Sequence, residues 1–251
     1  MFAARLPLMD EYDPAQSFDE PVASRYDNAP RGDEEECVAF LADLAGEGPV
    51  LELAIGTGRI GLPLAATGVR VDGIDISQPM VDQLRAKPGG ADLEVVIGDF
   101  AAVPVEGSYR LIYVVFNTLF NLITQDDQVR CFRNVAEHLT DDGVFVVEAF
   151  EPSYLVRFPH SEYVKAADVG TERVHLDVAR IDPVAQLLEK THVWLSAEGT
   201  RLNPVVLRYS WPSELDLMAR MAGLQLHERF GGWRREPFTG KSELHVSVWG
   251  R

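Results

Sequence analysis

Blocks of apolar and polar residues alternate over residues 33–150 in a way that predicts helices and strands in turn. Short apolar runs bounded by glycine, proline or aspartate are typical of buried strands, and the segments between them repeat apolar residues at helical spacing. Because strands separated by helices form right-handed parallel crossovers, we expect a parallel sheet with helices on both faces. The predicted strands are 49–55, 69–74, 93–97, 110–116 and 144–149, and the predicted helices are 33–45, 59–66, 77–86 and 126–139.

The pattern changes after residue 150. Strict alternation over 171–209, with a turn at 198–200, predicts a three-stranded antiparallel insert. In one of its strands His192 and Trp194 face the same side, because strand residues two apart share a face. The prediction is completed by a helix at 213–222 with Ser213 as its N-cap and by strands at 224–230 and 244–249.

These elements divide the chain into four parts. We expect an N-terminal helical cap at 1–48, an α/β core at 49–150, an antiparallel β insert at 151–212 and a C-terminal part at 213–251 that completes the core sheet. The strands outside the insert make a seven-stranded, mostly parallel sheet. Ligands of such sheets bind beyond the carboxyl ends of the strands, so candidate site residues are sought there.

The charge of the chain restricts its partners. The net charge of −16, from 39 acidic and 23 basic residues, argues against nucleic acid, which requires a basic surface. Residues 10–47 hold twelve of the acids against Arg25 and Arg31. This stretch is either a solvated segment or a cap that closes over the site and whose field favours a cationic ligand.

Two further features concern the compartment. No apolar run reaches the ~18 residues that a membrane span requires, and the N-terminus lacks the apolar stretch of a secretory signal. Cys37 and Cys131 are too few for a disulfide framework. A reducing cytoplasm is therefore the expected location.

A glycine-rich turn follows the first predicted strand. Residues 56–61 match the pattern G-x-G-x-x-G, and Asp75 ends the second strand. Such a turn lets the backbone approach a phosphate or nucleoside closely, and the acid can bind ribose hydroxyls. Alone, the pattern also fits a nicotinamide dinucleotide site.

Two other acids discriminate between these cofactors. Glu52 lies inside the first strand, where a buried carboxylate is unfavourable unless it has a partner. A pyrophosphate would repel it, whereas an ammonium or sulfonium would attract it. Asp99 ends the third strand and can accept a hydrogen bond from the exocyclic amine of adenine.

At these positions the chain resembles the class I S-adenosylmethionine (SAM) methyltransferases. Residues 52–58 resemble the first family motif, residues 73–77 the second and residues 98–100 the third. Ala54 replaces the first glycine of the first motif, where a small residue and its carbonyl suffice. The resemblance implies a Rossmann-like fold with SAM as cofactor, and it covers about 26–150 and the last two strands.

The resemblance assigns a role to each motif residue. Glu52 and the carbonyl of Ala54 would bind the methionyl ammonium. Gly56 and Gly58 would let the backbone approach the cofactor, and Asp75 would bind the ribose hydroxyls. The adenine would be held by Ile76, Met80, Gly98, Asp99 and Phe100.

Four further residues would surround the reacting end of the cofactor. Phe116 and Asn117, after the fourth strand, would flank the transferable methyl group. Tyr26 resembles an N-terminal tyrosine that closes over the methionyl carboxylate, which Arg59 would also reach.

Acid–base candidates come from position alone. Glu148 follows the fifth strand and is either a site residue or a structural carboxylate; His192 is either a base or a half-exposed strand histidine. The histidines show no metal-binding spacing, so no metal is expected. Three further aromatic residues either line an apolar acceptor pocket or belong to the core: Trp211, Trp233 and Phe238.

The function expected from these features is SAM-dependent methyl transfer to an oxygen or nitrogen of a small molecule, for example a secondary-metabolite intermediate. An NAD-dependent oxidoreductase and a SAM-binding protein without catalysis are the alternatives. The chain has no Tyr-x-x-x-Lys pair, which disfavours the oxidoreductase. A homodimer is compatible with the sequence.

Overall fold

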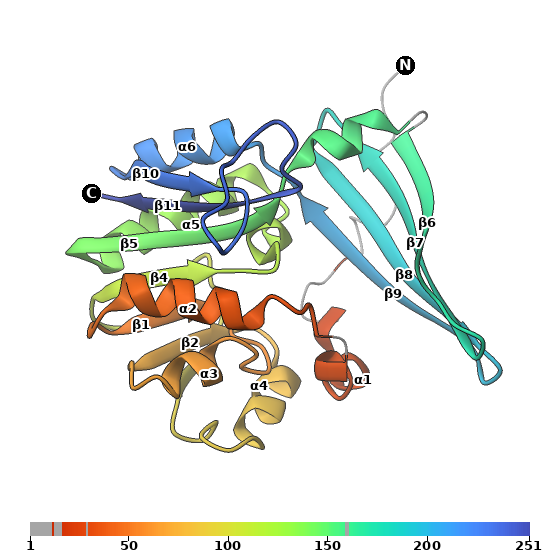
Figure 1. Ribbon diagram of the computed structural model, residues 1–251, viewed down its shortest axis with the longest axis horizontal. Helices are drawn as coiled ribbons and strands as arrows, with labels where there is room; N and C mark the ends of the chain where they lie inside the picture. The colour runs from red at the N-terminus through yellow and green to blue at the C-terminus, as the bar shows by residue number, and fades with distance from the viewer. Residues whose placement is uncertain (1–11, 13–16, 29, 159–160) are drawn as a thin grey trace.

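A seven-stranded mixed sheet forms the centre of the molecule (Figure 1). The computed structural model describes residue 12 and residues 17–28, 30–158 and 161–251. Strand β11 is antiparallel to both of its neighbours, whereas β3, β2, β1, β4 and β5 pair in parallel. The strands follow the order β10 (Gln225–Phe230), β11 (Leu244–Gly250), β5 (Leu139–Phe150), β4 (Tyr109–Val114), β1 (Val50–Leu53), β2 (Val71–Asp75) and β3 (Glu94–Ile97). The predicted seven-stranded, Rossmann-like architecture is confirmed.

Helices cover both faces of this sheet. On one face α2 (Glu34–Ala45), α3 (Gly61–Ala65) and α4 (Gln78–Arg85) pack through residues such as Phe40, Leu64 and Leu84. On the other, α5 (Gln125–His138) and α6 (Pro212–Met221) pack through residues such as Phe132 and Leu215. The buried side chains of β4 alternate between the two faces, and burying each large apolar side chain stabilises the fold by roughly 1.5–3 kcal/mol.

A second sheet projects from one end of the core (Figure 1). It consists of β6 (Glu162–Val169), β7 (Arg173–Asp182), β8 (Leu187–Ser196) and β9 (Gly199–Arg208), all antiparallel. The prediction of three strands was wrong because β6 was missed. Its residues are almost all exposed, so it lacks the alternation that burial of one face imposes.

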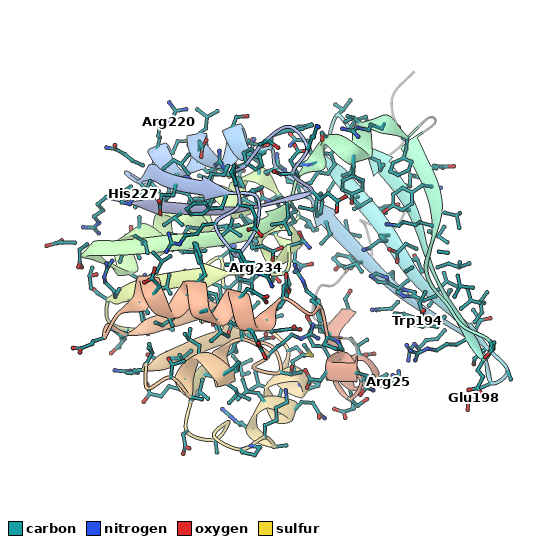
Figure 2. All side chains as sticks on the ribbon, in the orientation of Figure 1. Arg25, Trp194, Glu198, Arg220, His227 and Arg234 are labelled. Atoms are coloured by element: carbon teal, nitrogen blue, oxygen red, sulfur yellow. The ribbon has the colours of Figure 1, made fainter. Side chains whose placement is uncertain are left out.

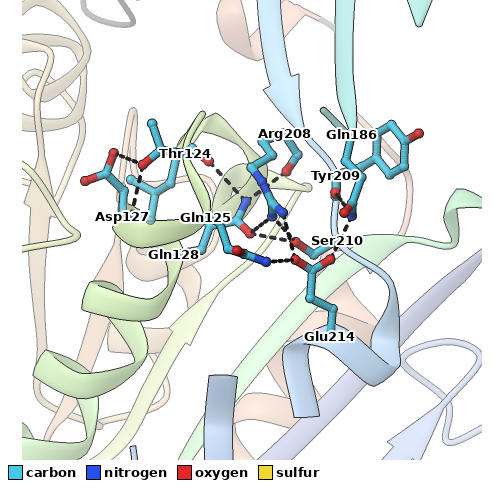
Figure 3. Close-up of polar contacts among 10 residues, drawn as sticks. Thr124, Gln125, Asp127, Gln128, Gln186, Arg208, Tyr209, Ser210 and Glu214 are labelled. Carbon is cyan, nitrogen blue, oxygen red and sulfur yellow. Dashed lines mark hydrogen bonds and ion pairs between the residues drawn. The ribbon is translucent and has the colours of Figure 1, made fainter. Parts of the chain in front are cut away.

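A buried polar network fixes this sheet to the core (Figure 3). The guanidinium of Arg208, at the end of β9, donates to Gln128 of α5 at 2.8 Å and to Ser210 at 2.7 Å. It also pairs with Glu214 of α6 at 2.7 Å. Gln186, which precedes β8, donates to the other oxygen of Glu214 at 2.7 Å. Because each charged group is paired, the network holds the strands of the insert in a defined orientation on the helices.

Several predicted boundaries shift for local reasons. The fourth strand ends at Val114 because Phe116 and Asn117 adopt left-handed backbone angles. Helix α6 begins at Pro212, one residue early, and Trp211 is its N-cap, so Ser213 is not the cap. Pro212 fits the first turn because its missing N–H would have no partner there.

The N-terminal segment lies between the core and the second sheet (Figure 1). It contains α1 (Glu20–Ala23), capped by Asp19, and the 3-10 turn η3 (Tyr26–Asn28). Ser77, the N-cap of α4, donates to the carbonyl of Phe18 at 2.6 Å, which anchors the segment on the core. No helix in the described part of the chain is both long enough and apolar enough to cross a membrane.

Candidate active site

The turn after β1 approaches the end of β2 closely. Ala54, Gly56 and Gly58 all have positive φ angles, near 58°, 58° and 75°. The N–H of Gly56 donates to a carboxylate oxygen of Asp75 at 2.7 Å. A Cβ on Gly58 would lie 2.9 Å from Leu62, so a side chain there would displace the following helix.

A cavity of about 280 Å³ opens over this turn. We call it the cofactor cavity. All but two of the residues to which the motifs assign a cofactor role line it; the exceptions are Gly58 and Gly98. The lining residues among them are Tyr26, Glu52, Ala54, Gly56, Arg59, Asp75, Ile76, Met80, Asp99, Phe100 and Phe116.

Glu52 is the chemically most unusual residue of this cavity. Its side chain is buried, and its Oε2 atom has no hydrogen-bond partner in the described chain. Burial raises the pKa of its carboxyl group to about 8. A Cβ on Gly61 would lie 2.6 Å from that oxygen, which explains the third glycine of the turn. A buried acceptor without a partner, facing a cavity, fits a cationic ligand group.

Asp75 and Asp99 stand at the ends of the next two strands. Each oxygen of Asp75 accepts a backbone N–H, from Gly56 and from Ser77, at 2.7 and 2.8 Å. Burial raises the pKa of Asp75. Asp99 accepts the N–H of Ala101 at 2.9 Å and pairs with Arg130 at 2.9 Å. Both carboxylates keep lone pairs for hydroxyl or amine donors.

Apolar walls complete the cavity. Met80 is buried, and Ile76 is 44% exposed although it lines the cavity. An exposed isoleucine beside a nucleoside-sized space is suited to cover a flat ring. The walls and the acids together fit a ligand that joins a ring system, hydroxyl groups and an ammonium.

Tyr26, Arg59 and Phe116 form the outer wall. The Arg59 guanidinium lies 4.5 Å from the centroid of the Tyr26 ring and 5.4 Å from that of Phe116. It also donates to the Tyr26 carbonyl at 2.7 Å. Burial raises the pKa of the Tyr26 hydroxyl. Tyr26 therefore reaches the cofactor cavity from the N-terminal segment, where the motif resemblance expects it.

Glu148 lines neither this cavity nor the second cavity described below. It is buried, and its two oxygens accept hydrogen bonds from the two terminal nitrogens of Arg31, each at 3.2 Å. Burial raises its pKa, against the opposing charge of Arg31. One carboxylate oxygen also accepts a hydrogen bond from the N–H of Phe116 at 2.5 Å. The backbone carbonyl of Glu148 accepts the N–H of Asn117. The carboxylate is thus occupied in holding the turn after β4.

A second cavity, of about 960 Å³, adjoins the first. We call it the acceptor cavity. The two share six lining residues: Phe18, Tyr26, Arg59, Phe116, Thr118 and Asn121. Its far wall is the second sheet, through residues of β8 and β9. Asn117 and His192, two of the predicted catalytic residues, line it. The Asn117 side chain accepts the N–H of Phe150 at 2.5 Å.

His192 belongs to a cluster on the wall of the acceptor cavity. Its Nδ1 lies 2.7 Å from Asp177 Oδ1, and His175 Nε2 lies 3.2 Å from the same nitrogen. Burial lowers the pKa of His175. Lys190 Nζ lies 3.9 Å from the other oxygen of Asp177. The arrangement is that of a histidine oriented by a carboxylate, which is suited to proton transfer.

The same three side chains could ligate a metal. Within the described residues, His175, Asp177 and His192 have ligand atoms within 4.8 Å of one another. Spacing along the chain did not reveal this group because its members come from the paired strands β7 and β8, in which His192 faces Asp177. The neighbouring Lys190 opposes a further cation there.

Sequence reasoning missed further residues of this cavity. Arg25, His175, Lys190 and Arg201 all line it. The pairing register of β7, β8 and β9 could have revealed two of them. The turn at 198–200 places Arg201 opposite Trp194, and Trp194 lies opposite His175. Trp211, Trp233 and Phe238 line neither of the two cavities, and Trp233 is part of the buried core.

Residues 50–143 match the family model described as a methyltransferase domain. This match, the fold, and 40% identity to a solved methyltransferase over nearly the whole chain show that the protein belongs to the class I SAM-dependent methyltransferases. That structure is the CcbJ methyltransferase from Streptomyces caelestis, with a TM-score of 0.90 over 95% of this chain and 99% of that chain.

Two other relatives are more distant. The cypemycin N-terminal methyltransferase from a Streptomyces species is 28% identical over 201 residues, covering 79% of this chain and 81% of that protein. A SAM-dependent methyltransferase from Clostridium acetobutylicum ATCC 824 is 16% identical, with a TM-score of 0.73 over 97% of this chain and 94% of that chain, and shares the fold.

SAM is the cofactor, and the cofactor cavity fits it. The unpartnered Glu52 oxygen suits the methionyl ammonium, the Asp75 carboxylate suits the ribose, and Ile76 with Met80 suits the adenine. The class and cofactor exclude the NAD-dependent alternative, and the protein is an enzyme rather than a non-catalytic binder of SAM.

Proposed function

We propose that this enzyme transfers the methyl group of SAM to the nitrogen of a small-molecule amine that binds in the acceptor cavity. The observation that carries the proposal is the charge of that cavity. Its lining includes Arg25, Arg31, Arg59, Lys190 and Arg201, whereas Asp19 is the one acidic side chain that the described residues contribute. The similarity to the cypemycin N-terminal methyltransferase supports nitrogen as the acceptor atom.

A cationic cavity favours the nucleophilic form of an amine. An ammonium has no lone pair with which to attack, so the acceptor must bind as the neutral amine or lose its proton in the site. Nearby positive charges lower the pKa of an amine because they disfavour its protonated form. The basic residues of this lining contrast with the net charge of −16 of the chain as a whole.

The residues of the cofactor cavity position the reaction. Glu52 and the Ala54 carbonyl hold the ammonium end, Asp75 the ribose, and Asp99 with the Phe100 backbone the adenine edge. Bound SAM supplies an electrophilic methyl group on its sulfonium. Phe116 lines both cavities, so it lies where the acceptor meets the cofactor. Catalysis then depends mainly on alignment and on exclusion of water.

His192 would accept the proton of the acceptor. With Nδ1 bonded to Asp177 at 2.7 Å, the other ring nitrogen of His192 carries the lone pair. The carboxylate stabilises the imidazolium that forms. Glu148 acts instead as a positioning residue, because its oxygens are engaged by Arg31 and by the Phe116 N–H.

The proposal is tested with panels of primary and secondary amines and matched alcohols, with formation of S-adenosylhomocysteine as the readout. Methylation of amines alone is the expected result; transfer to the alcohols alone would overturn the choice of nitrogen. His192→Gln should lower kcat and remove the acidic limb of its pH profile, and Asp177→Asn should lower kcat, while KM for SAM stays within twofold in both variants. His227→Gln, on exposed β10, is the matched control.

The remaining expectations concern partners and location. The acidic charge supports an acceptor other than nucleic acid, and two free, buried cysteines support a reducing compartment such as the cytoplasm. A homodimer is supported by the exposed valines of edge strand β6, Val164 at 68% and Val169 at 72%. Light scattering of the purified protein tests it.

A further inference from the structure

We infer that the acceptor carries an anionic oxyacid group, a carboxylate or a phosphate, and that Arg25 and Arg201 bind it from opposite walls of the acceptor cavity. This inference rests on the proposed function, because it describes the molecule that the cavity receives. It assigns a subsite outside the cofactor motifs.

Arg201 is held in place by a row of aromatic side chains across the second sheet. Its guanidinium lies 4.3 Å from the centroid of the Trp194 ring. Trp194 stacks in turn on His175, with centroids 4.4 Å apart and planes 11° apart. The three residues are cross-strand neighbours on β9, β8 and β7. The guanidinium is therefore positioned on the cavity wall by a stacking contact, which leaves its N–H donors available for an anion.

Arg25 approaches from the other side, after α1 in the N-terminal segment. Arg25 and Arg201 both line the acceptor cavity. Figure 2 shows Arg25 on this segment and Trp194 on the strand that faces it. The charge of Arg25 and, more strongly, burial lower the pKa of Arg201, so the two guanidinium groups are close enough to repel each other.

Neither arginine has a carboxylate partner among the residues that the structure describes. Across the described residues, ion pairs involve Arg31, Arg130, Arg208, Arg229 and Arg235, but neither Arg25 nor Arg201. Asp19, the acid in the cavity lining, is used to cap α1 through the N–H of Val22. In a chain with 39 acidic residues, two adjacent cations without a counter-charge are conspicuous.

The other basic groups of the cavity are already engaged. Arg31 pairs with Glu148, and Arg59 donates to the Tyr26 carbonyl. Lys190 faces Asp177. Arg25 and Arg201 are thus the pair whose charge an incoming ligand can neutralise. An oxyanion between them would accept hydrogen bonds from both guanidinium groups and offset the repulsion between these groups.

The test measures anion binding by calorimetry, with the protein saturated with S-adenosylhomocysteine. Inorganic phosphate and succinate are the two probes, and they distinguish a phosphate subsite from a carboxylate subsite. The variants are Arg25→Gln, Arg201→Gln and the double variant. Arg173→Gln is the control, because Arg173 lies on the same sheet, is 71% exposed and does not line the cavity.

The expected result is saturable binding of at least one probe, about threefold weaker in each single variant and at least tenfold weaker in the double variant. The Arg173→Gln protein should bind as the wild type does. Binding of neither probe, or unchanged binding in the double variant, overturns the inference. If Arg201→Gln folds poorly, the anion affinity of Arg25→Gln still tests the inference, because Arg25 is exposed and its substitution should not disturb the fold.

Two separate readouts keep this inference apart from the proposed function. The affinity for S-adenosylhomocysteine should stay within twofold in all four variants, which shows an intact cofactor cavity. Failure to methylate any amine would overturn the proposed function while leaving the anion affinities intact. If the arginine variants bind the anions as tightly as the wild type does while amine methylation is retained, the subsite alone is overturned.

Discussion

The carboxylate of Glu148 accepts the backbone N–H of Phe116 at 2.5 Å and so fixes a left-handed turn between the two cavities. Phe116 and Asn117 have φ angles of 59° and 63°, which are unfavourable for residues with side chains. Glu148, buried in β5 and paired with the partly exposed Arg31, holds this turn in place. The shape of the catalytic junction therefore depends on a residue that contacts neither ligand cavity.

Glu148→Gln should damage this junction without removing a base. Loss of one partner leaves Arg31 without its main counter-charge, so the free energy of unfolding should fall by about 2 kcal/mol, measured by urea denaturation. The value of kcat should fall about tenfold, and its pH profile should keep the wild-type shape. A profile that loses its acidic limb would show that Glu148 is the base. Arg31→Gln should reproduce the loss of stability.

Glu52→Gln should have opposite effects on cofactor binding and on stability. The glutamine cannot attract the ammonium, so the affinity for S-adenosylhomocysteine should fall by roughly ten- to a hundredfold. The ligand-free protein should gain about 2 kcal/mol at pH 8, because the substitution removes the cost of ionising a buried carboxyl group. Calorimetry and denaturation measure the two quantities. Unchanged affinity would remove Glu52 from the cofactor site.

The pKa of about 8 also predicts a pH dependence of cofactor affinity. Below that pKa Glu52 is protonated in the ligand-free protein, and only its ionised form attracts the ammonium. The affinity for S-adenosylhomocysteine should therefore rise with pH up to about 8, by at most about tenfold per pH unit. The Glu52→Gln protein should lack this slope; an equal slope in both proteins would assign it to another group.

His245 should make the fold sensitive to acid. It is buried in β11, its Nε2 has no partner in the described chain, and burial lowers its pKa to about 3. Between pH 6.5 and 3 the unfolded chain binds a proton that the folded chain does not, so this residue's contribution makes stability fall as pH falls, by at most ~1.4 kcal/mol per pH unit. His245→Asn should flatten this part of the stability profile, whereas exposed His227→Gln should not.

Deleting residues 1–30 should weaken cofactor binding without unfolding the sheet. The deletion removes Tyr26 and the contact of Asp27 with Thr57 at 2.7 Å, but none of the strands in the described part of the chain. An affinity for S-adenosylhomocysteine reduced about tenfold, with wild-type far-UV circular dichroism, is the expected result. Unchanged affinity would return the segment to the role of a solvated tail.

The motifs allowed most of the core and the cofactor cavity to be predicted from the sequence. Glu52, Asp75 and Asp99 each end or occupy a strand, and parallel strands bring such positions to one edge whatever the loops do. Asp75 was informative because its distance from the glycine turn is fixed by one helix and one strand. The apolar runs of β1, β2 and β4 reflect burial on both faces, whereas β3 lies at the edge of the sheet and is mostly exposed.

The acceptor cavity could not be predicted in the same way. Its wall depends on the register between β7, β8 and β9, which brings together His175, Trp194 and Arg201 from distant positions. Strand β6 has no buried face and left no periodic signal. One interpretation of the acidic N-terminal segment favoured a cationic ligand, but the segment contributes Arg25 to the acceptor cavity. Its Asp19 caps α1, and its Asp27 accepts a hydrogen bond from Thr57 of the core.

The position of Phe18 and Tyr26 in the walls of both cavities has a consequence for the order of events. A ligand in either cavity stabilises the docked N-terminal segment, and docking completes the wall of the other. The affinities for SAM and for the acceptor are then thermodynamically linked, each raising the other by the same factor. Undocking of the segment removes part of the wall of both cavities, so release of the methylated product and of S-adenosylhomocysteine should depend on the same movement.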